Sequence, residues 1–437
     1  MRDLMADFFR NWPRKTAEFI IFIINSLVFL ILDLLDFIMC IFFRYIDKFL
    51  EGETTPCYCQ SQSQIKRKDF EEKQIGNSVT LYGRKNVFRE MGFFGIKILW
   101  KFDEGYKKTG VDHLKKTRWS DCGCESCVSW MKFDGDHKLH VVVKEPSKGN
   151  QDFDNTPTEN VIFLHGFMSS SLLWTETMFP QLASSKYRLF AVDLLGFGNS
   201  PKPKDCLYTL NDHLEMVEKS VIREYNLNSF HLVAHSMGCM IAIALAAKHP
   251  NKLKSITLIA PPYFIASEEE DASEIALKKL AYKSLWPPLL FGASFMTWYE
   301  HLGRCVCFIV CRNHRTWEKI LQLVTRKRKL HFQVIDLTRH THHSAWHTMH
   351  NVLCGGAKMM DSCLEILRQS RARVIVVQGS RDKVVPVECS NNIKVKVPDA
   401  TVKIVTGATH NTVIIGREKE FAAELELIWD TVIDSKE

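Results

Sequence analysis

The chain has 437 residues, of which 46% are hydrophobic and 24% charged, and its formal net charge is +7. This composition excludes a disordered or fibrous chain, and the length is enough for the core of an enzyme. Two dense basic runs, 66–68 and 326–329, have no nucleic-acid-binding motif beside them. We therefore expect solvated surface there and no nucleic-acid partner.

The N-terminal segment is typical of an export signal or a membrane anchor. Residues 19–32 are apolar apart from two polar residues, and basic residues precede them. Extended to Phe43, the segment is long enough to span a bilayer if Asp33 and Asp36 are accommodated near one end. No small-residue cleavage site follows, which favours an uncleaved anchor. We assign residues 1–45 to a signal peptide or membrane anchor and expect the secretory pathway, with a buried soluble helix as the alternative.

Two groups of cysteines stand out: Cys57 with Cys59, and Cys122 with Cys124 and Cys127. Thiols this close together could hold zinc with a fourth ligand from the first group, but the spacing fits no common zinc module. Disulfides between the groups are favoured if the chain enters the secretory route, and free buried thiols are the third interpretation. We expect no bound metal and no cofactor.

Short β-branched runs separated by helical stretches begin after residue 118. Helices are expected over 213–224 and 237–248. Strands alternating with helices predict an α/β fold, with a mostly parallel sheet and helices on both faces. The predicted strands carry the runs KLHVVVKEP, VIFLHG, YRLFAVD, FHLVAHS, LKSITLIAPP, RVIVVQGS and TVKIVTGATH.

One interval, between Pro262 and about Leu353, interrupts this alternation. It has helical character and no convincing strand, which predicts a helical cap over the C-terminal ends of the strands. Its aromatic residues could form the cap's own core or line an acyl-sized pocket. Its histidine cluster, HTHHSAWHTMH, could bind a metal or contact substrate, but packing is the favoured interpretation. The predicted organisation is a signal or anchor at 1–45, a partly disordered linker at 46–118, core at 119–262, cap at 263–352 and core at 353–437.

The run HLVAHSMGCMIAIALAAKHP places a serine between a strand-like and a helix-like stretch. Ser236 has small residues two before and two after it, Ala234 and Gly238. That pattern is typical of a nucleophile elbow, because crowding at the tight turn demands small neighbours and the turn projects the hydroxyl above the sheet. Glycine is usual where Ala234 stands, and a methyl is the largest group the turn is expected to tolerate.

A serine nucleophile needs a base, and the base needs an acid that holds its tautomer. In this fold the acid follows a late strand and the histidine comes near the end of the chain, and the sequence supplies Asp382 and His410 at those places. Two backbone N–H groups should stabilise the oxyanion. We assign them to Met237, after the nucleophile, and Phe167, in the loop after an earlier strand.

Neighbouring residues of that loop complete the predicted site. Gly166 permits the close approach of the loop, and His165 is expected to shape it by hydrogen bonding rather than to transfer protons. From about Arg118 onward the chain resembles the α/β-hydrolase superfamily and, more closely, the plant BODYGUARD family. The matching stretches are RWSDCGCESCVSW, HGFMSSSLLWTET, AVDLLGFGNSPKP, HLVAHSMGC, WPPLLFGAS, WYEH, SAWHTMHN, PVECS and EFAAELELIW.

The resemblance implies an α/β-hydrolase fold and a serine hydrolase of the lysophospholipase or esterase type, acting on fatty-acyl esters or lysophospholipids in cutin and cuticle formation. By position it gives Ser236 as nucleophile, Asp382 and His410 as its partners, and His165 as part of the active-site loop. It also implies a protein at the cell membrane, in the extracellular cell wall, or both. An acyltransferase using the same acyl-enzyme, and a ligand receptor with little turnover, remain alternatives.

Overall fold

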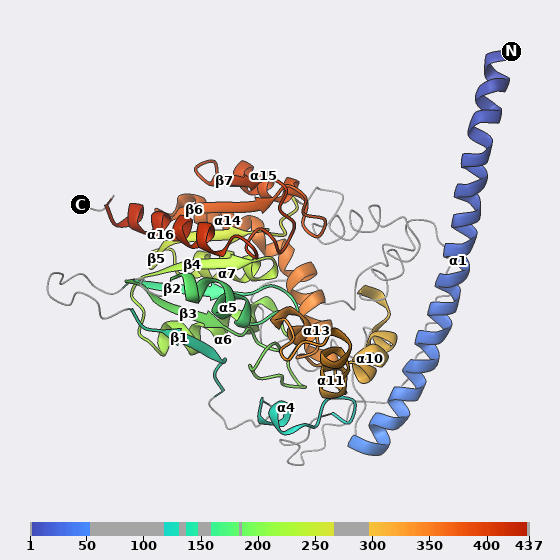
Figure 1. Ribbon diagram of the computed structural model, residues 1–437, viewed down its shortest axis with the longest axis horizontal. Helices are drawn as coiled ribbons and strands as arrows, with labels where there is room; N and C mark the ends of the chain where they lie inside the picture. The colour runs from blue at the N-terminus through green and yellow to red at the C-terminus, as the bar shows by residue number, and fades with distance from the viewer. Residues whose placement is uncertain are drawn as a thin grey trace. The chain divides into compact units, whose positions relative to one another are not determined.

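The structure is a computed structural model that describes residues 2–52, 118–130, 137–146, 159–182, 186–265 and 297–434 (Figure 1). Contacts divide the chain into two compact units, residues 1–110 with 274–306 and residues 111–273 with 307–437. Nearly all of the expected linker, including Cys57 and Cys59, lies outside the described residues, as does the first part of the expected cap.

The seven runs predicted as strands all form strands of one sheet, which belongs to the second unit. The strand order is β1-β3-β2-β4-β5-β6-β7. Strand β1 pairs antiparallel with β3, and the other neighbouring pairs are parallel, so the predicted mostly parallel sheet is confirmed. The strands are β1 (Val141–Lys144), β2 (Asn160–Leu164), β3 (Arg188–Val192), β4 (Phe230–His235), β5 (Leu253–Ile259), β6 (Arg373–Gly379) and β7 (Thr401–Val405).

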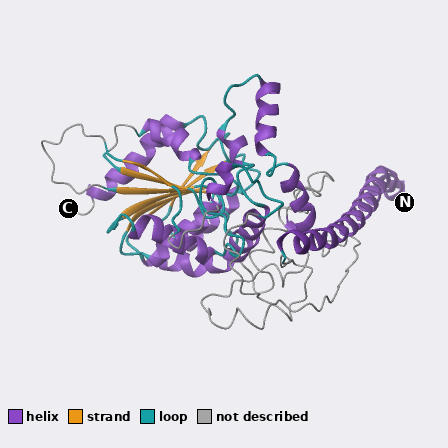
Figure 2. Ribbon diagram, turned by 90° about the horizontal axis from the view of Figure 1, so that it is seen from below, coloured by secondary structure: helices purple, strands orange, loops and turns teal. Residues whose placement is uncertain are grey.

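Alternate side chains of the strands enter two different cores, one on each face of the sheet. In β2, Val161 and Phe163 belong to one core, whereas Ile162 and Leu164 belong to the other. Both faces are therefore buried under helices, as the near-continuous apolar runs require (Figure 2). One face carries α5 (Leu172–Gln181) and α16 (Glu418–Asp434), and the other carries α6 (Leu210–Val217), α7 (Met237–Lys248), α14 (Met360–Gln369) and α15 (Val387–Lys396).

The described part of the interval between β5 and β6 is helical and contains no strand, from residue 297 onward. Its later helices are bonded to the loops that follow β2 and β3. Ser170 Oγ donates to Asp336 Oδ1 at 2.8 Å, and Ser344 Oγ donates to the Gly196 carbonyl at 2.9 Å. The helices are α10 (Glu300–Ile309), α11 (His314–Thr325), α12 (Phe332–Asp336) and α13 (His342–Thr348), followed by the π-helical η3 (Met349–Cys354) and the 3₁₀ turn η4 (Gly355–Met359).

The histidine cluster in and around α13 is largely buried. His343 Nε2 donates to the Cys206 carbonyl at 2.9 Å, and the His343 and His347 rings lie 4.2 Å apart. Burial lowers the pKa of His347 to about 3, so this imidazole stays neutral. These contacts are those of packing side chains that join the insertion to the core.

The first unit contains the long helix α1 (Arg2–Glu51), whose segment Phe19–Glu51 is long and apolar enough to cross a membrane. Its acidic residues face the start of α10, within the same unit. Asp36 Oδ1 accepts hydrogen bonds from the backbone N–H groups of His301 and Leu302, each at 3.0 Å. Asp47 forms a two-bond ion pair with Arg304, with both distances 2.7 Å. Asp33 Oδ1 accepts a hydrogen bond from the Tyr299 hydroxyl at 3.0 Å, so both acids that the sequence analysis noted in the apolar segment, Asp33 and Asp36, are paired with protein groups.

Candidate active site

Ser236 lies at the sharp turn between β4 and α7. Its backbone angles are φ 54° and ψ −123°, a region that residues other than glycine rarely adopt. Such strain costs on the order of 1–3 kcal/mol and persists only where the surrounding fold enforces it. Here the turn leaves Ser236 half-buried while its neighbours His235 and Met237 are buried.

The small residues around Ser236 differ in how strongly the fold requires them. A methyl group on Gly238 would lie 2.5 Å from the His165 carbonyl oxygen and 2.8 Å from that of Leu164, so glycine is needed there. Ala234, in contrast, is fully buried in a packed core and carries its methyl group without difficulty. The turn therefore tolerates alanine two residues before Ser236 but not two residues after it.

Asp382 and His410 follow β6 and β7, and the structure brings them together. His410 Nδ1–H donates to Asp382 Oδ2 at 2.8 Å, and the Asp382 side chain is fully buried. Burial raises the pKa of the Asp382 carboxyl, but the hydrogen bond and charge of His410 and the N–H groups of Val384 and Val385 outweigh it, so the pKa is lowered overall. The carboxylate is therefore available to hold the imidazole in one tautomer.

Two residues that the sequence analysis did not select support this pair. Gln378 is fully buried in β6, and its amide donates to Asp382 Oδ2 at 2.9 Å while its oxygen accepts from Ser390 Oγ. His235 Nε2–H donates to the His410 carbonyl at 3.0 Å, and the two rings lie 4.7 Å apart. Each carried a signal in the sequence: Gln378 is a polar residue inside an apolar strand, and His235 adjoins the serine.

His235 also places His410 next to the elbow, because the ring that packs on His410 belongs to the residue before Ser236. Burial lowers the pKa of His235 to about 3, so this imidazole is neutral, and its one N–H is donated to the His410 carbonyl. Within the described residues Ser236 Oγ makes no hydrogen bond to His410 in this conformation. Catalytic hydrogen bonds often tighten only when substrate is bound, so the Ser236–His410 contact stays a prediction.

The loop after β2 lies directly against Ser236. A methyl group on Gly166 would lie 3.1 Å from Ser236 Cβ. His165 Nδ1–H donates to the Gly166 carbonyl at 2.7 Å, and its Nε2 accepts from the Leu194 N–H at 2.9 Å. Both ring nitrogens of His165 are therefore engaged, one within this loop and the other with the loop that follows β3, and burial lowers its pKa.

Two backbone donors at this place are not used by the protein itself. Among the described residues neither the Phe167 N–H nor the Met237 N–H has a hydrogen-bond acceptor. Met237 begins α7, where the positive end of the helix dipole adds to the attraction for an anion. Unused donors beside a strained serine are what an oxyanion hole requires, although their role there stays a prediction.

Comparisons with known proteins agree with this arrangement. A family model described as the alpha/beta hydrolase fold matches residues 159–287. The chain is 50% identical over 424 residues to "Probable lysophospholipase BODYGUARD 4" of Arabidopsis thaliana, covering 96% of this chain and 99% of the relative. The chain belongs to the BODYGUARD family. BODYGUARD 5 of the same plant is 48% identical, covering 92% of this chain and 94% of the relative.

Membership of the BODYGUARD family confirms the resemblance drawn from the sequence. BODYGUARD 1 of Arabidopsis thaliana is 40% identical over 454 residues and covers 93% of this chain and 95% of the relative. The alignments therefore extend well beyond the sheet and its elbow. Together with the sheet topology, the matches show that this BODYGUARD chain has the α/β-hydrolase fold.

Proposed function

We propose that this BODYGUARD-family protein is a serine carboxylic-ester hydrolase that acts on fatty-acyl esters. The observation that carries the proposal is the strained Ser236 turn, which lies beside the buried Asp382–His410 pair. The names of the relatives support a lysophospholipid as one substrate class, since those of BODYGUARD 4 and BODYGUARD 5 read probable lysophospholipase.

The mechanism follows from the positions of these groups. Ser236 Oγ attacks the acyl carbonyl carbon while its proton passes to His410 Nε2, and Asp382 stabilises the imidazolium through Nδ1. The Phe167 and Met237 N–H groups hold the oxyanion of the tetrahedral intermediate. His410 returns its proton to the leaving alcohol as the C–O bond breaks. Water, deprotonated by His410, then releases the fatty acid and restores Ser236.

The place of action is also part of the proposal. The apolar helix α1 supports a signal or anchor that directs the protein to the secretory pathway, and thence to the cell membrane or the extracellular wall. The family resemblance further supports a role in cutin and cuticle formation. The partner that we propose for the protein is its lipid ester substrate, met at the surface of the membrane or the wall.

The experiment is labelling of the purified full chain with a fluorophosphonate, followed by mass spectrometry of lysophospholipid incubations. The wild type should label and release free fatty acid, and Ser236→Ala should do neither. Ser362→Ala, which changes an exposed serine on α14, is the matched control and should behave as the wild type. Added glycerol distinguishes transfer from hydrolysis, because an acyltransferase would form acylglycerol in place of fatty acid.

Two outcomes would overturn the proposal. Labelling that persists in Ser236→Ala would show that another residue is the nucleophile. A folded wild type that neither labels nor turns over any acyl ester would favour a ligand receptor.

A further inference from the structure

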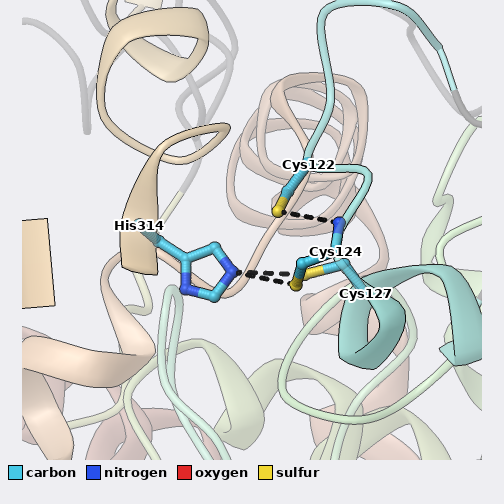
Figure 3. Close-up of side chains that lie close together, drawn as sticks. All are labelled: Cys122, Cys124, Cys127 and His314. Carbon is cyan, nitrogen blue, oxygen red and sulfur yellow. Dashed lines mark hydrogen bonds between the residues drawn. The ribbon is translucent and has the colours of Figure 1, made fainter. Parts of the chain in front are cut away.

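Three cysteines and a histidine meet at a place that takes no part in the proposed acyl chemistry. Cys122, Cys124 and Cys127 lie just before and within α4 (Glu125–Trp130), and His314 is the first residue of α11. His314 Nε2 lies 3.6 Å from Cys124 Sγ and 3.4 Å from Cys127 Sγ. Figure 3 shows the imidazole pointing at these sulfurs, with Cys122 beside them.

The spacing of the four ligand atoms fits a tetrahedral metal site. Zinc bonds of about 2.3 Å to sulfur and about 2.05 Å to nitrogen imply a sulfur–nitrogen separation of about 3.6 Å and a sulfur–sulfur separation of about 3.8 Å. The two measured separations, 3.6 and 3.4 Å, match the first of these values. All four ligand atoms lie within 4.8 Å of one another, so small side-chain shifts complete the tetrahedron.

The other nitrogen of His314 is held as metal-binding histidines are usually held. Its Nδ1–H donates to Glu318 Oε1 at 3.0 Å, one helical turn further along α11. This bond leaves the lone pair of Nε2 directed at the sulfurs, which is the tautomer that binds a metal. The His314 side chain is only 5% exposed, so the ring is fixed in this orientation.

The closeness of the three sulfurs also favours a cation. All of the ligand atoms lie within 4.8 Å of one another, so three thiolates here would repel one another strongly. A divalent ion among them removes that repulsion, as metal binding to thiolates requires.

A second group of thiols provides a useful contrast. Cys307, Cys311 and His340 also lie close together, with His340 Nε2 3.8 Å from Cys307 Sγ and 3.5 Å from Cys311 Sγ. This group offers three ligands, and within the described residues His340 Nδ1 is buried without a hydrogen-bond partner. In the part of the chain that the structure describes, this group has neither a fourth ligand nor an orienting carboxylate, so it gives weaker support for a metal site.

We propose that Cys122, Cys124, Cys127 and His314 bind one zinc ion in a closed, structural site. Thiolate and imidazole ligands in a tetrahedral set suit zinc, and four protein ligands leave no position for substrate. The ion would tie the segment around α4 to the start of α11, 187 residues further along the chain from Cys127. It would therefore fix the middle of the helical insertion, at the start of α11, to the segment that leads into the sheet.

This proposal differs from two expectations drawn from the sequence, namely the absence of a metal and disulfides between the two cysteine groups, of which Cys57 and Cys59 lie outside the described residues. The cysteines of the described residues, Cys122, Cys124 and Cys127 among them, are free thiols. A thiolate bound to zinc cannot take part in a disulfide, so the two assignments exclude each other. The fourth ligand comes from a histidine that no sequence spacing marked.

The test is the zinc content of the full chain, produced with zinc available and purified under reducing conditions without chelator. The wild type should hold about one zinc per chain at this site, and Cys127→Ser and His314→Ala should each lose it. His314→Cys keeps four ligands as a Cys₄ set and should retain the ion. Cys305→Ser and His331→Ala change a cysteine and a histidine outside the cluster and are the matched controls.

Cobalt replacement gives a second measurement that does not depend on activity. The wild type should show thiolate-to-cobalt charge transfer and the intense d–d bands of tetrahedral cobalt, and the spectrum of His314→Cys should shift because sulfur replaces nitrogen. Ser236→Ala should keep its zinc, so failure of the acyl chemistry would leave this proposal unaffected. A zinc-free wild type, retention of zinc in Cys127→Ser and His314→Ala, or a disulfide among the three cysteines would overturn it.

Discussion

Two imidazole–carboxylate pairs in the same unit are proposed to serve different chemistry. His410 Nδ1 lies 2.8 Å from Asp382, and His314 Nδ1 lies 3.0 Å from Glu318. The carboxylate of the first pair is fully buried, whereas the Glu318 side chain is 24% exposed. A carboxylate that must stabilise an imidazolium needs a buried, fully hydrogen-bonded position, but one that only orients a metal ligand does not. The difference between the two sites is set by the group at Nε2, which is sulfur beside His314 and, in the proposed mechanism, the hydroxyl of Ser236 beside His410.

Removing the buried carboxylate should have the largest effect. In Asp382→Asn the amide can donate to His410 and favour the wrong tautomer, so we expect turnover of a soluble acyl ester to fall on the order of 10⁴-fold. The substrate KM should change little, and zinc content should not change. Asp399→Asn, at an exposed position after α15, is the control for the loss of one charge. Turnover within tenfold of the wild type would contradict the triad.

Removing the partly exposed carboxylate of Glu318 should have a smaller effect, and that effect should fall on zinc binding rather than on ester turnover. Glu318→Gln keeps the shape of the side chain but weakens the hold on His314 Nδ1, and we expect zinc affinity to fall about 10–100-fold. Competition with a chromophoric chelator measures the change, and ester turnover should stay at the wild-type level. Glu365→Gln, which breaks a surface pair with Arg368 on α14, is the matched variant. Equal zinc affinity in Glu318→Gln and wild type would remove Glu318 from the site.

The first of these regions could be predicted from the sequence because its residues follow strand ends. Parallel strands bring their C-terminal ends to one edge, so an elbow serine after β4 and residues after β6 and β7 share that edge whatever lies between them. The Asp382–His410 contact needs nothing from the insertion. That is why the chain order of Ser236, Asp382 and His410 was enough to select them.

The second region could not be predicted, because its ligands come from segments without a shared strand edge. Cys124 and His314 are 190 residues apart, and only the packing of α11 brings them together. The cysteine spacing indicated a site, but the fourth ligand that it suggested, Cys57 or Cys59, lies outside the described residues, and no spacing pointed to His314. Gln378 was missed for another reason. A polar residue inside an apolar strand has no evident role in the sequence until the structure shows its buried partner, here Asp382.

Gln378 gives a way to test how closely the buried carboxylate is held. In Gln378→Glu a second carboxylate lies beside Asp382, and like charges raise the pKa of the new group. At pH 8 both are ionised, and we expect kcat to fall about tenfold because Asp382 is displaced from His410. As pH falls toward 6, the introduced carboxyl group takes up a proton and can donate to Asp382 again, so the ratio of variant to wild-type kcat should rise. A ratio that does not change with pH would mean that Gln378 only packs.

Asp336 completes the comparison, because it is a buried carboxyl without an imidazole partner. It lies at the end of α12, is 3% exposed and accepts a hydrogen bond from Ser170. Burial raises its pKa to about 7, the nearby Asp193 adds to the rise, and Ser170 and Arg339 oppose it. The contrast with Asp382, whose pKa is lowered, isolates what a neighbouring imidazole contributes.

The raised pKa predicts a small, pH-dependent effect on stability. The folded chain holds the Asp336 proton more tightly than the unfolded chain, so its contribution is fully present below about pH 4 and is lost as pH rises through about 7. Asp336→Asn can still accept from Ser170 and carries no charge at any pH. We expect it to be more stable than the wild type at pH 8, on the order of 1–3 kcal/mol, and nearly equal to it at pH 4.5. Thermal unfolding of both proteins at the two pH values measures the difference, and a gap of equal size at both would mean that Asp336 is ionised throughout.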